Sequence, residues 1–123
     1  MRYKPTRGLP YDFSEGAAAF VELMKDRSRP SVVLCGNDVL AVGALRGARQ
    51  LGLKVPQDVS ITGFDDIELA QVVTPELTTV HVPHRKMGLL AAQEVIGMIE
   101  EKRPGVSQSL EAKVVDRASV KHL

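Results

Sequence analysis

Two stretches decide the fold: SVVLCGND at residues 31–38 and VSITGFDD at residues 59–66. Each is a short apolar run that ends in polar side chains, and such runs are typical of strands buried on both faces of a parallel sheet. Apolar residues at helical spacing follow the first run through residues 39–51, and Gly52 is suited to ending that helix. The two stretches therefore predict neighbouring parallel strands joined by a helix.

The alternation of helix and strand continues outward in both directions. Residues 1–13 have the composition of a loop or tail, after which Ser14 is the expected N-cap of a helix with Glu15 in its first turn. Further along we expect a helical turn, a strand, a long helix opened by proline and a final strand, at residues 67–72, 77–82, 84–102 and 110–116. This order predicts an α/β fold with an open parallel sheet flanked by helices.

Composition limits the classes of function. The chain has 123 residues, enough for one domain or part of one, and a net charge of +1, which does not favour binding to a phosphate backbone. Its single cysteine, Cys35, fits a reducing compartment. The sequence shows neither a signal peptide nor an apolar run of the ~20 residues that span a membrane. We therefore expect a cytoplasmic protein without a membrane partner.

The polar residues at the two strand ends predict a small-molecule site. Ligands of open α/β sheets bind beyond the carboxyl ends of the strands. Asn37 can donate and accept hydrogen bonds, an ionised Asp65 only accepts, and Phe64 lies beside it, so we predict these three residues as ligand contacts. Asp38 and Asp66 have a structural alternative, in which Asp38 caps its helix and Asp66 starts the following turn.

An enzymatic alternative is weaker. Asp38, Asp65 and Asp66 could form an acidic cluster for Mg²⁺ or for acid–base catalysis. The chain offers no convincing pair of nucleophile and base, and Cys35 is most simply a small buried strand residue. The histidines at positions 81 and 84 have no third metal ligand nearby. We therefore predict no catalytic residue, no metal and no cofactor.

Several motifs, in one order, carry a family resemblance. They are NDVLAVGAL at 37–45, LGLKVPQDVS at 51–60, GFDD at 63–66, TPELTTV at 74–80, Met87-Gly88 and Ala91-Ala92. Over about residues 11–120 the chain resembles the C-terminal part of the effector-binding domain of lactose/galactose-repressor (LacI/GalR-type) transcription regulators. The individual motifs are weak, but their order and spacing make the set specific.

The resemblance implies a fold and an effector site. It implies part of a periplasmic-binding-protein-like type I fold, in which two α/β lobes hold a small-molecule effector such as a sugar, a purine or an organic acid. Asn37 and Asp65 match positions that commonly contact the effector in the family. Val82 stands where the family often has a polar contact such as Gln, which permits a more apolar effector.

The resemblance also implies how the chain is organised. Residues 14–123 would form the C-terminal part of the effector-binding and dimerisation domain, with helix 84–102 belonging to the first lobe. Operator DNA would be bound by a helix-turn-helix domain in a preceding segment that this chain lacks. The alternative of a solute-binding receptor with the same fold would require an export signal, and none is visible.

The family dimerises through a helix that matches residues 39–51 and through the segment around 71–75. The resemblance therefore implies a homodimer of the parent protein, with contacts from Leu40, Ala44, Leu51, Val73 and Pro75. The alternative for the apolar helix residues is packing inside their own lobe.

Overall fold

The computed structural model describes residues 12–121, which divide into two units. Unit 1 comprises residues 12–81 and 114–121 of the described chain, and unit 2 comprises residues 82–113. The elements up to residue 81 are α1 (Phe13–Met24), β1 (Val32–Leu34), α2 (Asp38–Gln50), β2 (Ser60–Thr62), α3 (Leu69–Val72) and β3 (Thr79–His81). They are followed by α4 (His84–Glu100) and β4 (Lys113–Val115). The predicted order of helices and strands is confirmed.

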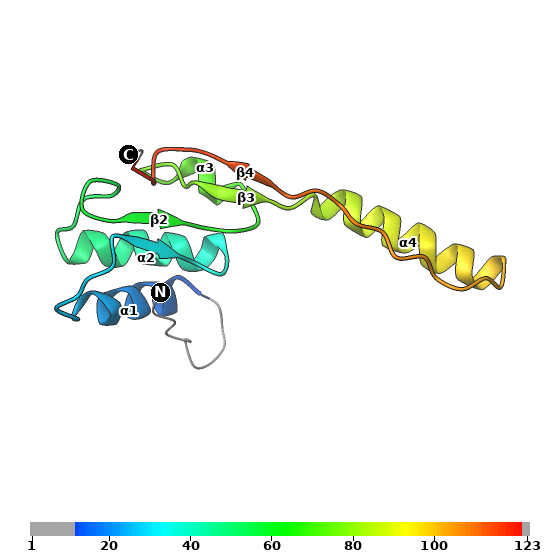
Figure 1. Ribbon diagram of the computed structural model, residues 1–123, viewed down its shortest axis with the longest axis horizontal. Coiled ribbons are helices and arrows are strands. Elements are labelled where there is room, and N and C mark those ends of the chain that lie inside the picture. Colours follow the sequence, from blue (N-terminus) through cyan, green and yellow to red (C-terminus); the bar gives the residue numbers. More distant parts are fainter. Residues whose placement is uncertain (1–11, 122–123) are drawn as a thin grey trace. The chain divides into compact units, whose positions relative to one another are not determined.

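The strands of unit 1 are parallel where the sequence predicted it. β1 pairs with β2 in parallel, with Val33 opposite Ile61, and two further parallel bridges join Thr62 to Thr78 and Asp65 to His81. β3 also pairs with β4. In Figure 1, α1 lies on α2, and α2 lies along β1 and β2. The predicted α/β class with an open parallel sheet is confirmed.

One face of β1 is not buried, contrary to the prediction. Val33 packs against the core, whereas Val32 and Leu34 are 50% and 67% exposed. Successive side chains of a strand point to opposite faces, so the core lies against the Val33 face alone. An apolar run indicates that both faces of a strand can be buried. It does not show that this chain contains the elements that would pack on both faces.

The core of unit 1 lies between the two long helices and the strands. It contains, among others, Phe20, Met24, Ala41, Ala44, Leu45, Ala48, Val59, Ile61, Ala70 and Leu77. α1 and α2 approach closely because Gly16 and Gly43 face one another's helices without side chains. Ala44 is only 2% exposed and belongs to this core, which favours the alternative of packing inside its own lobe over a dimer contact.

The start of α1 also differs from the prediction. Its N-cap is Asp12 rather than Ser14, and the backbone N–H of Glu15 donates to Asp12 Oδ1 over 2.8 Å. The helix therefore begins at Phe13, inside the expected loop or tail of residues 1–13, of which residues 1–11 lie outside the described part. Asp12 was missed because aspartate and serine cap equally well, and only the helix start separates them.

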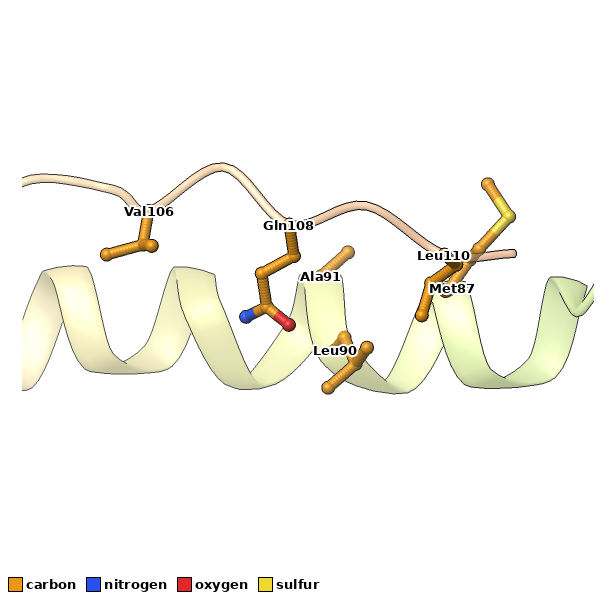
Figure 2. Close-up of a pocket in the computed structure, with 6 residues that line it drawn as sticks. All are labelled: Met87, Leu90, Ala91, Val106, Gln108 and Leu110. Atoms are coloured by element: carbon orange, nitrogen blue, oxygen red, sulfur yellow. The ribbon is translucent and has the colours of Figure 1, made fainter.

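Unit 2 consists of α4 and the extended segment that returns from its end. The carboxylate of Glu94 accepts from Arg103 Nη1 at 2.6 Å and from the backbone N–H of Val106 at 2.7 Å. Arg103 lies over Gly97, where a side chain would collide with the guanidinium. These contacts hold the return segment beside the helix, as Figure 2 shows for residues 106–110. Among the helices of residues 12–121, none is long and apolar enough to cross a bilayer.

Helix α4 carries an apolar surface that predicts self-association. Leu89, Val95, Ile96 and Ile99 are exposed large apolar side chains, and contiguous exposed patches of this kind drive association. We expect the 123-residue chain to self-associate at micromolar concentration in light scattering. The double variant Ile96→Lys/Ile99→Lys should shift it toward monomer.

The matched control is the substitution Lys86→Gln on the same helix, where the residue is exposed and polar. It should leave self-association as in the original chain. A monomeric original chain with a single sharp calorimetric transition would contradict this prediction.

Candidate functional site

Backbone hydrogen bonds bring the predicted strand-end residues together. The N–H of Cys35 donates to the carbonyl of Thr62 over 3.0 Å, and one step further the N–H of Asp38 donates to the carbonyl of Phe64 over 2.9 Å. The N–H of Asp65 in turn donates to the carbonyl of Val80 over 2.9 Å. The loop that follows β1 and the loop that follows β2 therefore lie side by side at the carboxyl ends of the strands.

Asn37 occupies the N-cap of α2. Its Oδ1 accepts from the backbone N–H of Leu40 over 2.8 Å, and its backbone is extended. The predicted cap at Asp38 is therefore wrong by one residue. Because the carboxamide oxygen satisfies the helix, the NH₂ group of Asn37 is the half of the side chain that can serve a ligand, as a donor.

Asp38 is fully buried, and its side chain links α2 to two segments that are distant in the sequence. Its carboxylate accepts from the Thr79 hydroxyl at 2.5 Å and from the backbone N–H of Ile67 at 2.9 Å. It also lies against Gly63, where any side chain would collide with it. Asp38 thus fixes the first turn of α2 to β3 and to the segment before α3, which is a structural role through partners that the sequence did not indicate.

Phe64 and Asp65 lie where the chain leaves β2. The ring of Phe64 is 41% exposed, so a ligand can pack on it. Asp65 and Asp66 both have positive φ, 108° and 56°, which side chains other than glycine rarely adopt. Such strained backbone clusters at functional sites, where the surrounding structure has to hold it. This left-handed turn at residues 65–66 lies directly after β2, beside the loop that carries Asn37.

Asp66 is held by two basic side chains. Its carboxylate accepts from Arg117 Nη2 at 2.6 Å and lies 3.0 Å from His81 Nδ1. Partial burial alone would raise the pKa of Asp66, but the hydrogen bonds from Arg117 and His81 outweigh it and hold that pKa below the ordinary carboxyl value. Its predicted role as the cap of the next turn is wrong, because Asp38 accepts the N–H of Ile67 instead.

Acid should weaken the contribution of Asp66 to stability. Because its folded-state pKa is lowered, the contribution is present above the unfolded value of about 3.9 and is lost as pH falls through the folded value. We expect Asp66→Asn to cost about 2 kcal/mol near neutral pH, in urea unfolding monitored by circular dichroism. The difference from the original chain should shrink as pH falls through the lowered pKa of Asp66.

The exposed carboxylate of Asp58, which accepts the backbone N–H of Lys54, supplies a control as Asp58→Asn. Its cost should stay below about 1 kcal/mol throughout the pH range. If Asp66→Asn lowers the free energy of unfolding by the same amount at neutral and at acid pH, the role assigned to Asp66 is contradicted.

The acidic residues do not converge on a metal. Within residues 12–121, no group of three or more His, Cys, Asp or Glu side chains could hold a metal ion. Asp38 and Asp66 are engaged by separate partners, and His81 pairs with Asp66. Burial, and then the charge of Asp38, raise the pKa of the Cys35 thiol to about 12, so it is a poor nucleophile at neutral pH. The enzymatic alternative built on Asp38, Asp65 and Asp66 therefore has no support in this geometry.

A separate groove lies in unit 2. It has a volume of about 340 Å³ and is lined by Met87, Leu90, Ala91, Val106, Gln108 and Leu110, which Figure 2 shows between α4 and the return segment. Gln108 is its one strongly polar lining side chain, and none of the predicted site residues contributes to it. The groove has the character of an uncovered packing surface, since polar groups that could orient a ligand are scarce.

Comparison with known proteins defines the class. The family model of the periplasmic binding protein-like domain matches residues 2–120, and the chain therefore belongs to that family. The relatives narrow this class further, because they are transcriptional repressors and regulators of the LacI type, and the chain corresponds to part of their effector-binding domain. The predicted fold and family are confirmed.

Three relatives illustrate the match. The HTH-type transcriptional repressor PurR of Proteus mirabilis is 39% identical over 112 residues, which cover 89% of this chain and 33% of the repressor. A LacI-family transcriptional regulator structure from Burkholderia phymatum is 32% identical with a TM-score of 0.79, covering 90% of this chain and 40% of that one. The lac repressor dimer bound to operator and the anti-inducer ONPF is 26% identical with a TM-score of 0.82, covering 89% and 38%. The chain thus spans about a third of the length of the curated relatives it matches.

Proposed function

We propose that this chain supplies one wall of the effector site, and part of the dimer contact, of a LacI-type transcriptional repressor. The observation that carries the proposal is the strained turn at Asp65–Asp66, held beside the N-cap residue Asn37 at the carboxyl ends of parallel strands. Asn37 would donate to the effector through its NH₂ group, Asp65 would accept from it, and Phe64 would pack against it.

The chemistry of this wall favours a ligand with both polar and flat or apolar parts. An acceptor carboxylate beside a donor amide suits hydroxyl and amine groups, and an exposed ring suits a sugar face or a purine. Sugars, purines and organic acids are thus the effector classes to test. The proposed role is binding rather than catalysis, because the relatives that the chain matches are transcriptional repressors.

Dimerisation and DNA binding belong to the proposal as well. The lac repressor to which the chain is similar is a dimer bound to operator. Leu40, Leu51, Val73 and Pro75 are at least partly exposed and remain our candidates for the dimer contact, without Ala44. Operator DNA would be contacted by a helix-turn-helix segment outside this chain, and the repressor would act in the cytoplasm.

Substitutions at the site test the proposal in a full-length regulator that contains this chain. Asp65→Ala and Asn37→Ala should each weaken the response of operator binding to effector at least about tenfold, because a polar effector group would lose its partner. The measurement is operator affinity by fluorescence anisotropy, titrated with candidate effectors of the three classes. The control Asp58→Ala removes an exposed carboxylate elsewhere in unit 1 and should leave the response of operator binding to effector unchanged. An unchanged response in both site variants would refute the assignment.

A further inference from the structure

The segment at residues 116–121 is hydrogen-bonded to β2 and to the residues that precede β3. The hydroxyl of Ser119 donates to the carbonyl of Ile61 at 2.6 Å and accepts from the N–H of Thr78 at 2.8 Å. The N–H of Ile61 donates to the carbonyl of Ser119 at 3.0 Å, and Ser119 is fully buried. The segment therefore joins β2 to the residues that lead into β3, as an additional line of backbone pairing.

Arg117 extends this attachment to the candidate site. Its backbone N–H donates to Thr78 Oγ1 at 2.9 Å, and Nη1 donates to the carbonyl of Leu77 at 2.8 Å. Nη2 reaches the carboxylate of Asp66 at 2.6 Å. The side chains of Arg117 and Asp66 are only 11% and 12% exposed. A planar guanidinium fixed by a carbonyl on one side and a carboxylate on the other has little freedom to move.

The left-handed turn needs such a constraint. Residues other than glycine rarely adopt positive φ because the backbone is strained there, and two such residues follow one another here. The N–H of Asp65 is bonded to Val80 on the strand side, while Asp66 is anchored through its carboxylate. Without the Arg117 contact, the anchor of Asp66 would rest on the half-exposed ring of His81.

We propose that Arg117 is a positioning residue of the effector site, which holds the turn at Asp65–Asp66 and so sets the direction of the Asp65 carboxyl group and the Phe64 ring. This role rests on the proposed function of that turn. Arg117 itself does not touch the effector but acts through Asp66. The geometry of the site thereby depends on a residue that lies about 50 positions after the turn in the sequence.

The competing explanation is that Arg117 merely stabilises the sheet, as Ser119 does. The two can be separated because Ser119 pairs with Ile61 and Thr78 but not with Asp66. Ser119→Ala is therefore the matched control for sheet attachment alone. Arg117→Gln removes the charge and the guanidinium contacts to Asp66 and to the Leu77 carbonyl, whereas Arg117→Lys keeps the charge without the two-sided geometry.

Amide hydrogen exchange by NMR on the complete 123-residue chain tests the role. Two reporters flank the turn, since the N–H of Asp65 is bonded to Val80 and the N–H of Ile67 to Asp38. We expect Arg117→Gln to speed exchange of both at least about tenfold relative to the α2 amide of Leu45. Arg117→Lys should give about threefold by the same measure, and Ser119→Ala should change all three amides together.

A second readout is the NMR titration of the Asp66 carboxyl group. Its pKa should rise toward the ordinary value in Arg117→Gln and stay low in Ser119→Ala. Should Arg117→Gln unfold the chain, Arg117→Lys provides the same comparison. Exchange at Asp65 and Ile67 that follows Leu45 in every variant would overturn the positioning role. Because neither readout uses a ligand, such a failure would leave the proposed effector function standing, and failure of the Asp65→Ala test would leave the positioning role standing.

Discussion

Replacing Asp38 by alanine should remove about 4 kcal/mol of stability from unit 1. The change leaves the buried Thr79 hydroxyl and the Ile67 amide without their acceptor, at about 1–3 kcal/mol each. The loss is large because α2, β3 and the segment before α3 all meet at this one carboxylate.

Urea unfolding followed by circular dichroism measures the effect. Asp38→Asn should be intermediate, since an amide keeps the shape and one acceptor but presents a donor to the second partner. The control Asp58→Ala removes an exposed carboxylate that accepts only the N–H of Lys54 and should cost about 1 kcal/mol. Equal midpoints for Asp38→Ala and Asp58→Ala would show that the Asp38 network does not hold the fold.

A side chain at Gly43 should separate α1 from α2. A Cβ at this position would collide with the carbonyl oxygen of Phe13 and with the backbone of Gly16, and backbone cannot yield as a flexible side chain can. We expect Gly43→Val to cost about 3 kcal/mol or more, in the same urea assay, because overpacking forces the two helices apart. Phe20 and Met24, which α1 contributes to the core, would lose cover.

Gly88 supplies the matched control for this substitution. It also lies inside a helix, α4, but a Cβ there would meet nothing within 4 Å. Gly88→Val should therefore leave the unfolding midpoint of unit 1 as it is. If Gly43→Val and Gly88→Val lower the unfolding midpoint equally, the loss of stability comes from a change in helix propensity and not from the close approach of α1 and α2.

The sequence was a good guide to the elements and a partial guide to the site. Short apolar runs ending in GND and GFDD identified the strands and their shared edge, because buried parallel strands have a characteristic composition. It could not decide which of Asn37 and Asp38 caps α2, since both side chains can cap and a shift of one residue exchanges their roles. The buried ties of Asp38 to Thr79 and Ile67 arise only from the tertiary fold.

The contacts between distant segments explain what sequence reasoning missed. Arg117 and Ser119 contact partners 39 or more residues away, and no local sequence pattern predicts such pairing. The apolar spacing of residues 39–51 indicated a helix that packs on other elements, but not that α1 would pack closely against α2. Periodicity identifies which residues are to be buried, whereas their partner depends on the whole fold.

The central claim is that the strand ends at Asn37 and Asp65 form one wall of an effector site. A crystal structure of the full-length regulator containing this chain, bound to its effector, tests it most directly. We expect effector atoms at about 3 Å from the Asp65 carboxylate and the Asn37 amide nitrogen, with the Phe64 ring in contact. An effector bound away from these residues, for example in the groove lined by Met87 and Leu90, would contradict it.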